Sequence, residues 1–199
     1  APSVIFMVCA LAAVGGVFFA WEARAWKLLA LIAAVAVVIG GFSTYSAVRA
    51  AKQDPLIWMK YVKGRPDQKP AYTLWNHHSY VTVQGEPGEL KPPLGWGVSE
   101  TWPEEKKIDQ IPIVIDAIAG TVMTRYTGKQ EEIEYLTYDV VNLAHYIKKN
   151  AEVLVLGVGG GRDVLSALAF DQESVTGVEI NKNMFKILRA LDKIGFDGC

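Results

Sequence analysis

A chain of 199 residues is long enough for one or two domains. Its formal net charge of −1 argues against a nucleic-acid-binding protein, because such proteins are usually basic. The two cysteines, Cys9 and Cys199, cannot provide a disulfide framework, and no spacing of ligand residues predicts a metal site.

Hydrophobic residues make up 51% of the chain, and they are concentrated near its start. Residues 1–20 and 28–48 contain no charged residue, and each run has the ~20 residues that a helix needs to cross a bilayer. The linking residues 21–27 include Trp21 and Trp26, which suit the membrane interface. We therefore predict a transmembrane helical hairpin over residues 1–48. A signal peptide and a buried core hairpin are the alternatives.

Residues 49–70 are predicted to be a juxtamembrane connector, beside lipid headgroups or as an ordinary solvated linker. They carry six basic residues, namely Arg49, Lys52, Lys60, Lys63, Arg65 and Lys69. By the positive-inside rule, this excess places the long polar part of the chain in the cytoplasm. We therefore predict an integral membrane protein of the bacterial inner membrane, with the lipid bilayer as a partner.

Residues 71–128 are predicted to form a small β-rich module. Aromatic and β-branched residues over 71–84 indicate one long strand or a hairpin. Glycine and proline residues break up 85–107, which we expect to be a loop. Residues 111–118 and 121–128 indicate two short strands around Ala119-Gly120.

Residues 129–199 are predicted to begin an α/β domain with a Rossmann-like, doubly wound sheet. A helix is expected over 131–150, with Asn150 as its cap, because apolar residues recur every three or four positions at Ile133, Leu136, Val140, Leu143 and Ile147. A strand over 152–157, a helix over 162–170, a strand over 174–180 and a helix over 181–196 follow. Both strands read as buried on both faces, and Asn181 is placed to cap the last helix.

Both ends of the sequence look cut. There is no initiator methionine, and the chain stops soon after a helical pattern that should lead into a further strand. We expect a fragment of a longer membrane protein, with the sheet incomplete.

The sequence Gly157-Val158-Gly159-Gly160-Gly161 joins the first of these strands to its helix. Glycines there allow positive φ angles and close approach of a ligand to the backbone. Glu179 ends the next strand, 22 residues after Gly157, where its carboxylate can bind both hydroxyls of a ribose. Strand, glycine turn, helix, strand and terminal acid together predict an adenosine-containing ligand.

The residues after the loop discriminate between ligands. Arg162 stands where dinucleotide-binding loops have their third glycine, and Asp163 lies in the first turn of the helix. A carboxylate at that point repels a pyrophosphate but suits a cation. We therefore favour S-adenosylmethionine or its decarboxylated form over NAD, although Asp163 can also be read as an ordinary helix-start carboxylate.

VLVLGVGGGRDVLSALAF followed by VTGVEIN resembles motif I and the acidic strand end of class I S-adenosylmethionine-dependent transferases. More narrowly, WNHHSYVTV, IDAIAGTVMTRYTG, EYLTYD and GGGRDVL, in this order, resemble membrane-bound spermidine-synthase-like proteins. The resemblance covers about residues 55–199. It implies several transmembrane helices, a β-rich module and a Rossmann-like aminopropyltransferase-like domain.

The resemblance also implies which residues form the site. The cofactor would contact Gly157, Gly159, Gly160, Gly161, Asp163, Glu179 and Ile180, with Glu179 on the ribose and Ile180 beside the adenine. Asp116, Tyr138 and Asp139 are candidates for holding an amine substrate. Alternatively, Asp116 satisfies a turn, and Tyr138 and Asp139 lie on the solvated face of their helix. The catalytic aspartate of aminopropyl transfer is expected beyond Cys199, and no metal is implied.

One position departs from the family. Spermidine synthases carry an aspartate inside the glycine loop, and this chain has Gly160 there, with Asp163 as a substitute on the helix. We expect an integral membrane transferase that moves an aminopropyl or methyl group from S-adenosylmethionine or its decarboxylated form to a small amine. A non-catalytic nucleotide-binding sensor on a transporter-like segment and an NAD-linked membrane oxidoreductase are the alternatives. Homo-oligomerisation is left open.

Overall fold

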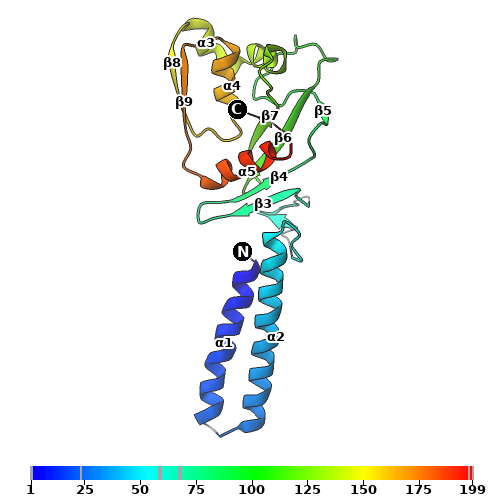
Figure 1. Ribbon diagram of the computed structural model, residues 1–199, viewed down its shortest axis with the longest axis vertical. Coiled ribbons are helices and arrows are strands. Elements are labelled where there is room, and N and C mark those ends of the chain that lie inside the picture. The colour runs from blue at the N-terminus through cyan, green and yellow to red at the C-terminus, as the bar shows by residue number, and fades with distance from the viewer. Residues whose placement is uncertain (1, 23, 58–59, 67–68, 197, 199) are drawn as a thin grey trace. The chain divides into compact units, whose positions relative to one another are not determined.

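The computed structural model describes residues 2–22, 24–57, 60–66, 69–196 and 198 (Figure 1). The chain divides into two compact units, Ala1–Lys60 and Tyr61–Cys199. It is a mixed α/β protein with two long apolar helices, a mostly antiparallel sheet and a small parallel strand pair.

The first unit is a pair of helices, α1 (Pro2–Glu22) and α2 (Trp26–Ala51). Edge-to-face rings join them near both ends, with 5.1 Å between the centroids of Phe6 and Phe42 and 5.4 Å between those of Trp21 and Trp26. Most of their apolar side chains are exposed. Because such a surface is unfavourable in water, it fits membrane anchoring, and the first helix, near the N-terminus, also fits a signal sequence.

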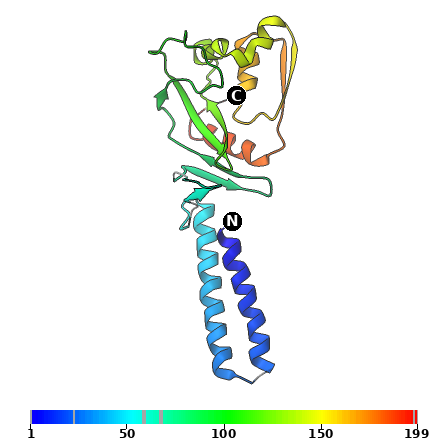
Figure 2. The same ribbon diagram turned by 180° about the vertical axis from the view of Figure 1, so that it is seen from behind.

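The second unit begins with a two-residue hairpin, β1 (Tyr61–Val62) and β2 (Arg65–Pro66), followed by a five-stranded sheet. Its strands are β3 (Tyr72–Trp75), β4 (Tyr80–Val83), β5 (Leu90–Lys91), β6 (Ile108–Ile115) and β7 (Ala119–Thr124). The order is β3-β4-β6-β5, β7 also pairs with β6, and every pairing is antiparallel. Over 71–84 the chain is therefore a hairpin, and 85–107 is a loop apart from β5. Figure 2 shows the long β6–β7 hairpin from behind.

The turn between β6 and β7 lies three residues earlier than Ala119-Gly120, the predicted position. Asp116 and Ala117 form it with φ angles of 52° and 59°, whereas Ala119 is already paired with Ile115. Two positive φ angles in succession match the right-handed twist of a hairpin, and an aspartate tolerates this conformation better than most residues.

The single helix predicted over 131–150 is wrong. The structure has three 3₁₀ segments, η1 (Gln130–Glu132), η2 (Glu134–Tyr138) and η3 (Val140–Asn142), before the short helix α3 (Leu143–Ile147). Asp139 interrupts them with an extended backbone, because its neighbours bond to the 97–99 segment, Ser99 N to Tyr138 O and Val140 N to Gly97 O. The predicted stripe is buried only in its first half. Asn150 has a positive φ, but it lies beyond the cap of α3 at Lys148.

A β-α-β-α segment completes the unit, with β8 (Glu152–Leu156), α4 (Arg162–Ala169), β9 (Ser174–Val178) and α5 (Lys182–Asp192). These elements match the predicted order, and β8 and β9 are parallel. The expectation that both strands are buried on both faces is wrong. Leu154, Leu156 and Val178 are 61%, 75% and 51% exposed, because α4 packs against one face and the other stays open.

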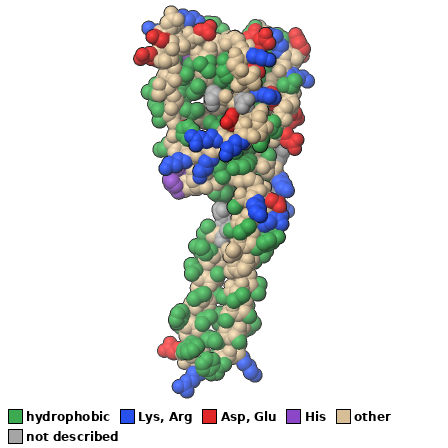
Figure 3. Space-filling view, in the orientation of Figure 1, with side chains coloured by type: hydrophobic (Ala, Val, Ile, Leu, Met, Phe, Trp, Pro, Cys, Tyr) green, Lys and Arg blue, Asp and Glu red, His purple; other side chains and the backbone are tan. Residues whose placement is uncertain are grey.

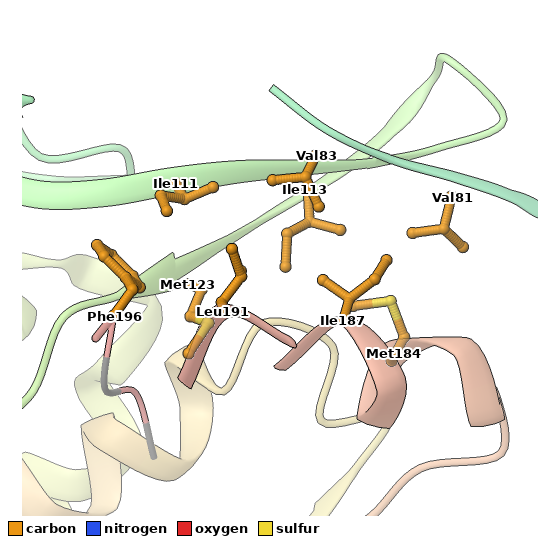
Figure 4. Close-up of a cluster of buried hydrophobic side chains, with 9 residues drawn as sticks. All are labelled: Val81, Val83, Ile111, Ile113, Met123, Met184, Ile187, Leu191 and Phe196. Carbon is orange, nitrogen blue, oxygen red and sulfur yellow. The ribbon is translucent and has the colours of Figure 1, made fainter. Parts of the chain in front are cut away.

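Two hydrophobic clusters hold the second unit together. The first packs α5 and Phe196 against β4, β6 and β7, and its side chains meet between the sheet and the helix in Figure 4. The second packs α4 against Ile133 and η2 with Trp102 and Ile108. The glycine segment between β8 and α4 also meets β7.

Candidate nucleotide-binding site

The glycine loop is built from conformations that other residues adopt only with strain. Gly157, Gly159 and Gly161 have φ angles of 83°, 55° and 89°, all in the left-handed region. Its turn is closed by Gly161 N bonding to Val158 O at 2.9 Å. Glycine accepts these angles without a steric penalty, so the sequence forms this loop in preference to a continuous strand or helix. A Cβ at residue 157 would meet no atom within 4 Å, so the space beside the Gly157 backbone is open to a ligand.

Gly160 is required for a different reason, which is close approach to β7. A Cβ at this position would overlap the carbonyl group of Val122, and Gly160 N donates to Thr121 Oγ1 at 3.1 Å. An aspartate therefore cannot occupy this position unless β7 moves away. The packing of the loop against β7 therefore requires glycine at this position.

Glu179 connects the loop to the start of α5. Its Oε2 accepts from Gly159 N at 3.0 Å and its Oε1 from Asn181 N at 2.6 Å. Each carboxylate oxygen has a further lone pair, so the group can still accept two hydroxyl donors. Ile180, the next residue in the sequence, is 80% exposed.

Asn181 joins the start of α5 to the β3–β4 turn of the sheet. Its Oδ1 caps α5 by accepting from Asn183 N at 3.1 Å, which confirms the predicted cap. The same oxygen accepts from Asn76 Nδ2 at 2.7 Å, and Asn181 Nδ2 donates to Ser79 Oγ at 2.8 Å. Because Asn76 and Ser79 belong to the β3–β4 turn, Glu179 is held by two independent parts of the fold.

Arg162 is the residue that sequence reasoning missed. In the sequence it is only a departure from a glycine pattern, whereas the structure pairs its guanidinium with Asp139. The two side chains are 9% and 0% exposed, and Asp139 Oδ1 also accepts from Val141 N at 3.0 Å. The available signals were an arginine directly after a loop of small residues and an acid directly before Val140 of the apolar stripe. Neither named the other as its partner.

The remaining predicted residues lie in three places. Asp163 is 60% exposed in the first turn of α4, with its Oδ1 3.6 Å from Arg162 Nη1. Asp116 binds the sheet, accepting from Tyr80 N at 2.8 Å, with Lys63 Nζ 3.9 Å away. Tyr138 packs edge-to-face on Trp102 at 5.1 Å. The structure thus brings the glycines together with Glu179. It pairs Asp139 with Arg162 at the start of α4, and the partners of Asp116 lie outside the glycine loop.

Two hollows adjoin these residues. One, of about 660 Å³, is lined by polar side chains that include Tyr138, Asp139 and Glu134. The other, of about 190 Å³, is mostly apolar and lies between Trp96, Arg162 and the β6–β7 hairpin. Asp139 is not on a solvated helix face, which was the alternative interpretation, because it is 1% exposed.

A buried polar network joins β7 to β6 and η2. Tyr135 Oη lies 2.8 Å from Thr124 Oγ1, and Gln110 Nε2 donates to both oxygens at 3.0 Å. Burial raises the pKa of Tyr135, so its hydroxyl remains protonated and able to donate. Among the residues that the structure describes, no group of three His, Cys, Asp or Glu side chains could hold a metal ion.

Comparison with protein-family models, with curated proteins and with solved structures finds no match to this chain.

Proposed function

We propose that the second unit binds S-adenosylmethionine or its decarboxylated form, as the opening part of a Rossmann-like transferase domain. The observation that carries this proposal is the Glu179 carboxylate, which meets Gly159 N in a loop of three positive-φ glycines between β8 and α4. Open backbone and a carboxylate with free lone pairs suit the ribose and adenine of such a ligand. The exposed Asp163 carboxylate suits its cationic groups.

The full activity that we propose is transfer of an aminopropyl or methyl group to a small amine by an integral membrane protein, with this unit in the cytoplasm. The bound sulfonium compound would supply a carbon that is activated for attack by an amine. The chain's own residues would hold the nucleotide, and the paired or hydrogen-bonded carboxylates Asp116 and Asp139 remain candidates for amine binding. The exposed apolar surfaces of α1 and α2 support the membrane location.

A nucleotide sensor without catalysis is the second candidate. The close contact of Gly160 with Val122 favours it, because this packing excludes the loop aspartate that the resemblance would require. The two candidates share the nucleotide site and differ in turnover, so binding and transfer must be measured separately.

The test is calorimetric titration of the full chain in detergent with S-adenosylmethionine and with its decarboxylated form. Glu179→Ala should weaken binding at least tenfold, which is ~1.4 kcal/mol, because charge-assisted bonds to the ribose are lost. Glu179→Gln should weaken it less, since an amide oxygen can still accept one hydrogen bond. Glu152 is an exposed carboxylate on β8, so Glu152→Ala is the matched control and should leave the affinity for both ligands unchanged.

Equal affinity in Glu179→Ala and in the unmodified chain would overturn the assignment of the site, as would saturable NAD binding without S-adenosylmethionine binding. Preference for the decarboxylated form would favour aminopropyl transfer. Preference for S-adenosylmethionine would favour methyl transfer or the sensor, and a radiolabelled transfer assay with small amines separates those two.

A further inference from the structure

The outer face of α5 carries a row of cations. Lys182, Lys186, Arg189 and Lys193 follow one another at spacings of four, three and four residues, so they lie on one side of the helix. All four are exposed, whereas Met184, Ile187 and Leu191 on the opposite side are buried against the sheet. Figure 3 shows the resulting cluster of basic side chains over α5.

This row is not explained by the fold of the unit itself. None of the four cations forms an ion pair with a residue that the structure describes, and Asp192 is the one carboxylate within 182–196. Like charges at such spacings destabilise a helix. Apolar side chains border the row, with Phe185 43% exposed and Ile194 63% exposed. Cations flanked by exposed apolar groups are typical of helices that lie on an anionic membrane surface.

The short connection to α2 limits how far the second unit can move from a membrane. Helix α2 ends at Ala51 and the second unit begins at Tyr61, so the nine residues between them reach at most about 32 Å. If α2 crosses a bilayer, as in the proposed function, the second unit stays close to that bilayer's surface at all times. Anionic headgroups attract clustered lysine and arginine within about a Debye length.

We propose that the face of α5 formed by Lys182, Phe185, Lys186, Arg189 and Lys193 docks on anionic lipid headgroups. Docking would fix the orientation of the glycine site toward the bilayer, because Asn181 joins the start of α5 to Glu179 and to the β3–β4 turn. The inference does not depend on which nucleotide binds.

The test is lysine acetylation of the full chain in nanodiscs, with mass spectrometry reading each lysine separately. Nanodiscs of phosphatidylcholine alone are compared with nanodiscs that also contain phosphatidylserine. Labelling of Lys182, Lys186 and Lys193 should slow about threefold or more in the anionic discs, because headgroups cover them. The exposed Lys129 and Lys148 are internal controls and should label equally in both. At ~1 M salt, where the Debye length falls to ~3 Å, the difference should disappear.

Charge reversal sharpens the result. In Lys186→Glu/Arg189→Glu the remaining lysines of α5 should lose their protection, whereas Lys148→Glu/Lys149→Glu should retain it. All four positions are exposed, and circular dichroism checks that the variants fold. The labelling comparison on the unmodified chain tests the proposal even if a variant does not fold. Equal labelling of α5 in the two discs would overturn the proposal. Protection in phosphatidylcholine discs that appears only after an RNA oligonucleotide or an acidic peptide is added would assign the face to a soluble polyanion instead, and would also overturn it.

Discussion

The two helices that cover the second unit's strands do so by different chemistry. The body of helix α5 meets β4, β6 and β7 through apolar side chains, and hydrogen bonds of Asn181 add a polar link between its start and the β3–β4 turn. Helix α4 meets its surroundings through an apolar cluster, a buried ion pair between Arg162 and Asp139, and the backbone contact of the preceding loop with β7. The stability of the α5 interface depends mainly on the apolar area that it buries. The second depends on particular partners.

This difference predicts unequal tolerance to substitution. An apolar interface loses stability roughly in proportion to the volume of the cavity that a substitution leaves, and neighbouring side chains reduce this loss when they relax into the cavity. A buried ion pair does not relax in this way, since removing one charge leaves the other uncompensated in a medium of low dielectric constant. Small changes near α4 should therefore cost more than small changes near α5.

The largest effect is expected for Asp139→Asn. The substitution conserves shape but removes the buried counter-charge of Arg162 and leaves it only the exposed Asp163 carboxylate at 3.6 Å, which should cost ~3 kcal/mol. Hydrogen exchange of α4 amides in the full chain measures the loss locally. Glu134→Gln is the control, because its ion pair with Lys106 is exposed and such pairs contribute ~0–1 kcal/mol. A loss below ~1 kcal/mol in Asp139→Asn would show that the Arg162 charge finds another partner or reaches water.

An intermediate effect is expected for Gly160→Ala. The added methyl group would overlap the carbonyl of Val122, so the loop or β7 must shift at a cost of ~1–3 kcal/mol. Gly120→Ala, on the β7 strand that Gly160 contacts, is the matched control, because a Cβ at residue 120 meets no atom within 4 Å and φ is not positive there. Thermal unfolding followed by exchange of the β7 amides compares the two variants. Equal stability in both would contradict the close packing of loop and strand.

The smallest effect is expected on the α5 side. Ile187→Val removes one methylene group from a fully buried side chain and should cost ~0.5–1.5 kcal/mol. Ile194→Val, on a 63% exposed side chain, should stay within ~0.5 kcal/mol. The same exchange measurement on α5 provides the values. If Ile187→Val cost as much as Asp139→Asn, the distinction between the two interfaces would fail.

Sequence periodicity predicted the elements whose position is decided by burial. Helix α5 follows the spacing of its buried residues, and the glycine loop follows from φ angles that glycine alone accepts readily. Prediction failed where a partner distant in sequence decides the structure. The stripe over 131–150 reads as a helix, but Asp139 leaves it to pair with Arg162, 23 residues away. Strands β8 and β9 read as buried because composition does not show which face a neighbour covers.

The candidate site divides in the same way. Glu179 and the glycines could be found, because strand, turn and acid lie in one continuous stretch. The reason for Gly160 could not, since it requires the position of Val122 on another strand.

The hydrogen bond between Asn76 and Asn181 joins residues 105 positions apart, and it has a consequence for synthesis of the protein. A ribosome adds roughly 5–20 residues per second, so the β3–β4 hairpin emerges ~5–20 s before the helix that covers it. During that interval Val81 and Val83, both fully buried in the finished unit, have no helix against which to pack. Chaperone binding to the nascent chain should therefore be strongest after residue 83 has emerged and should end once α5 is complete.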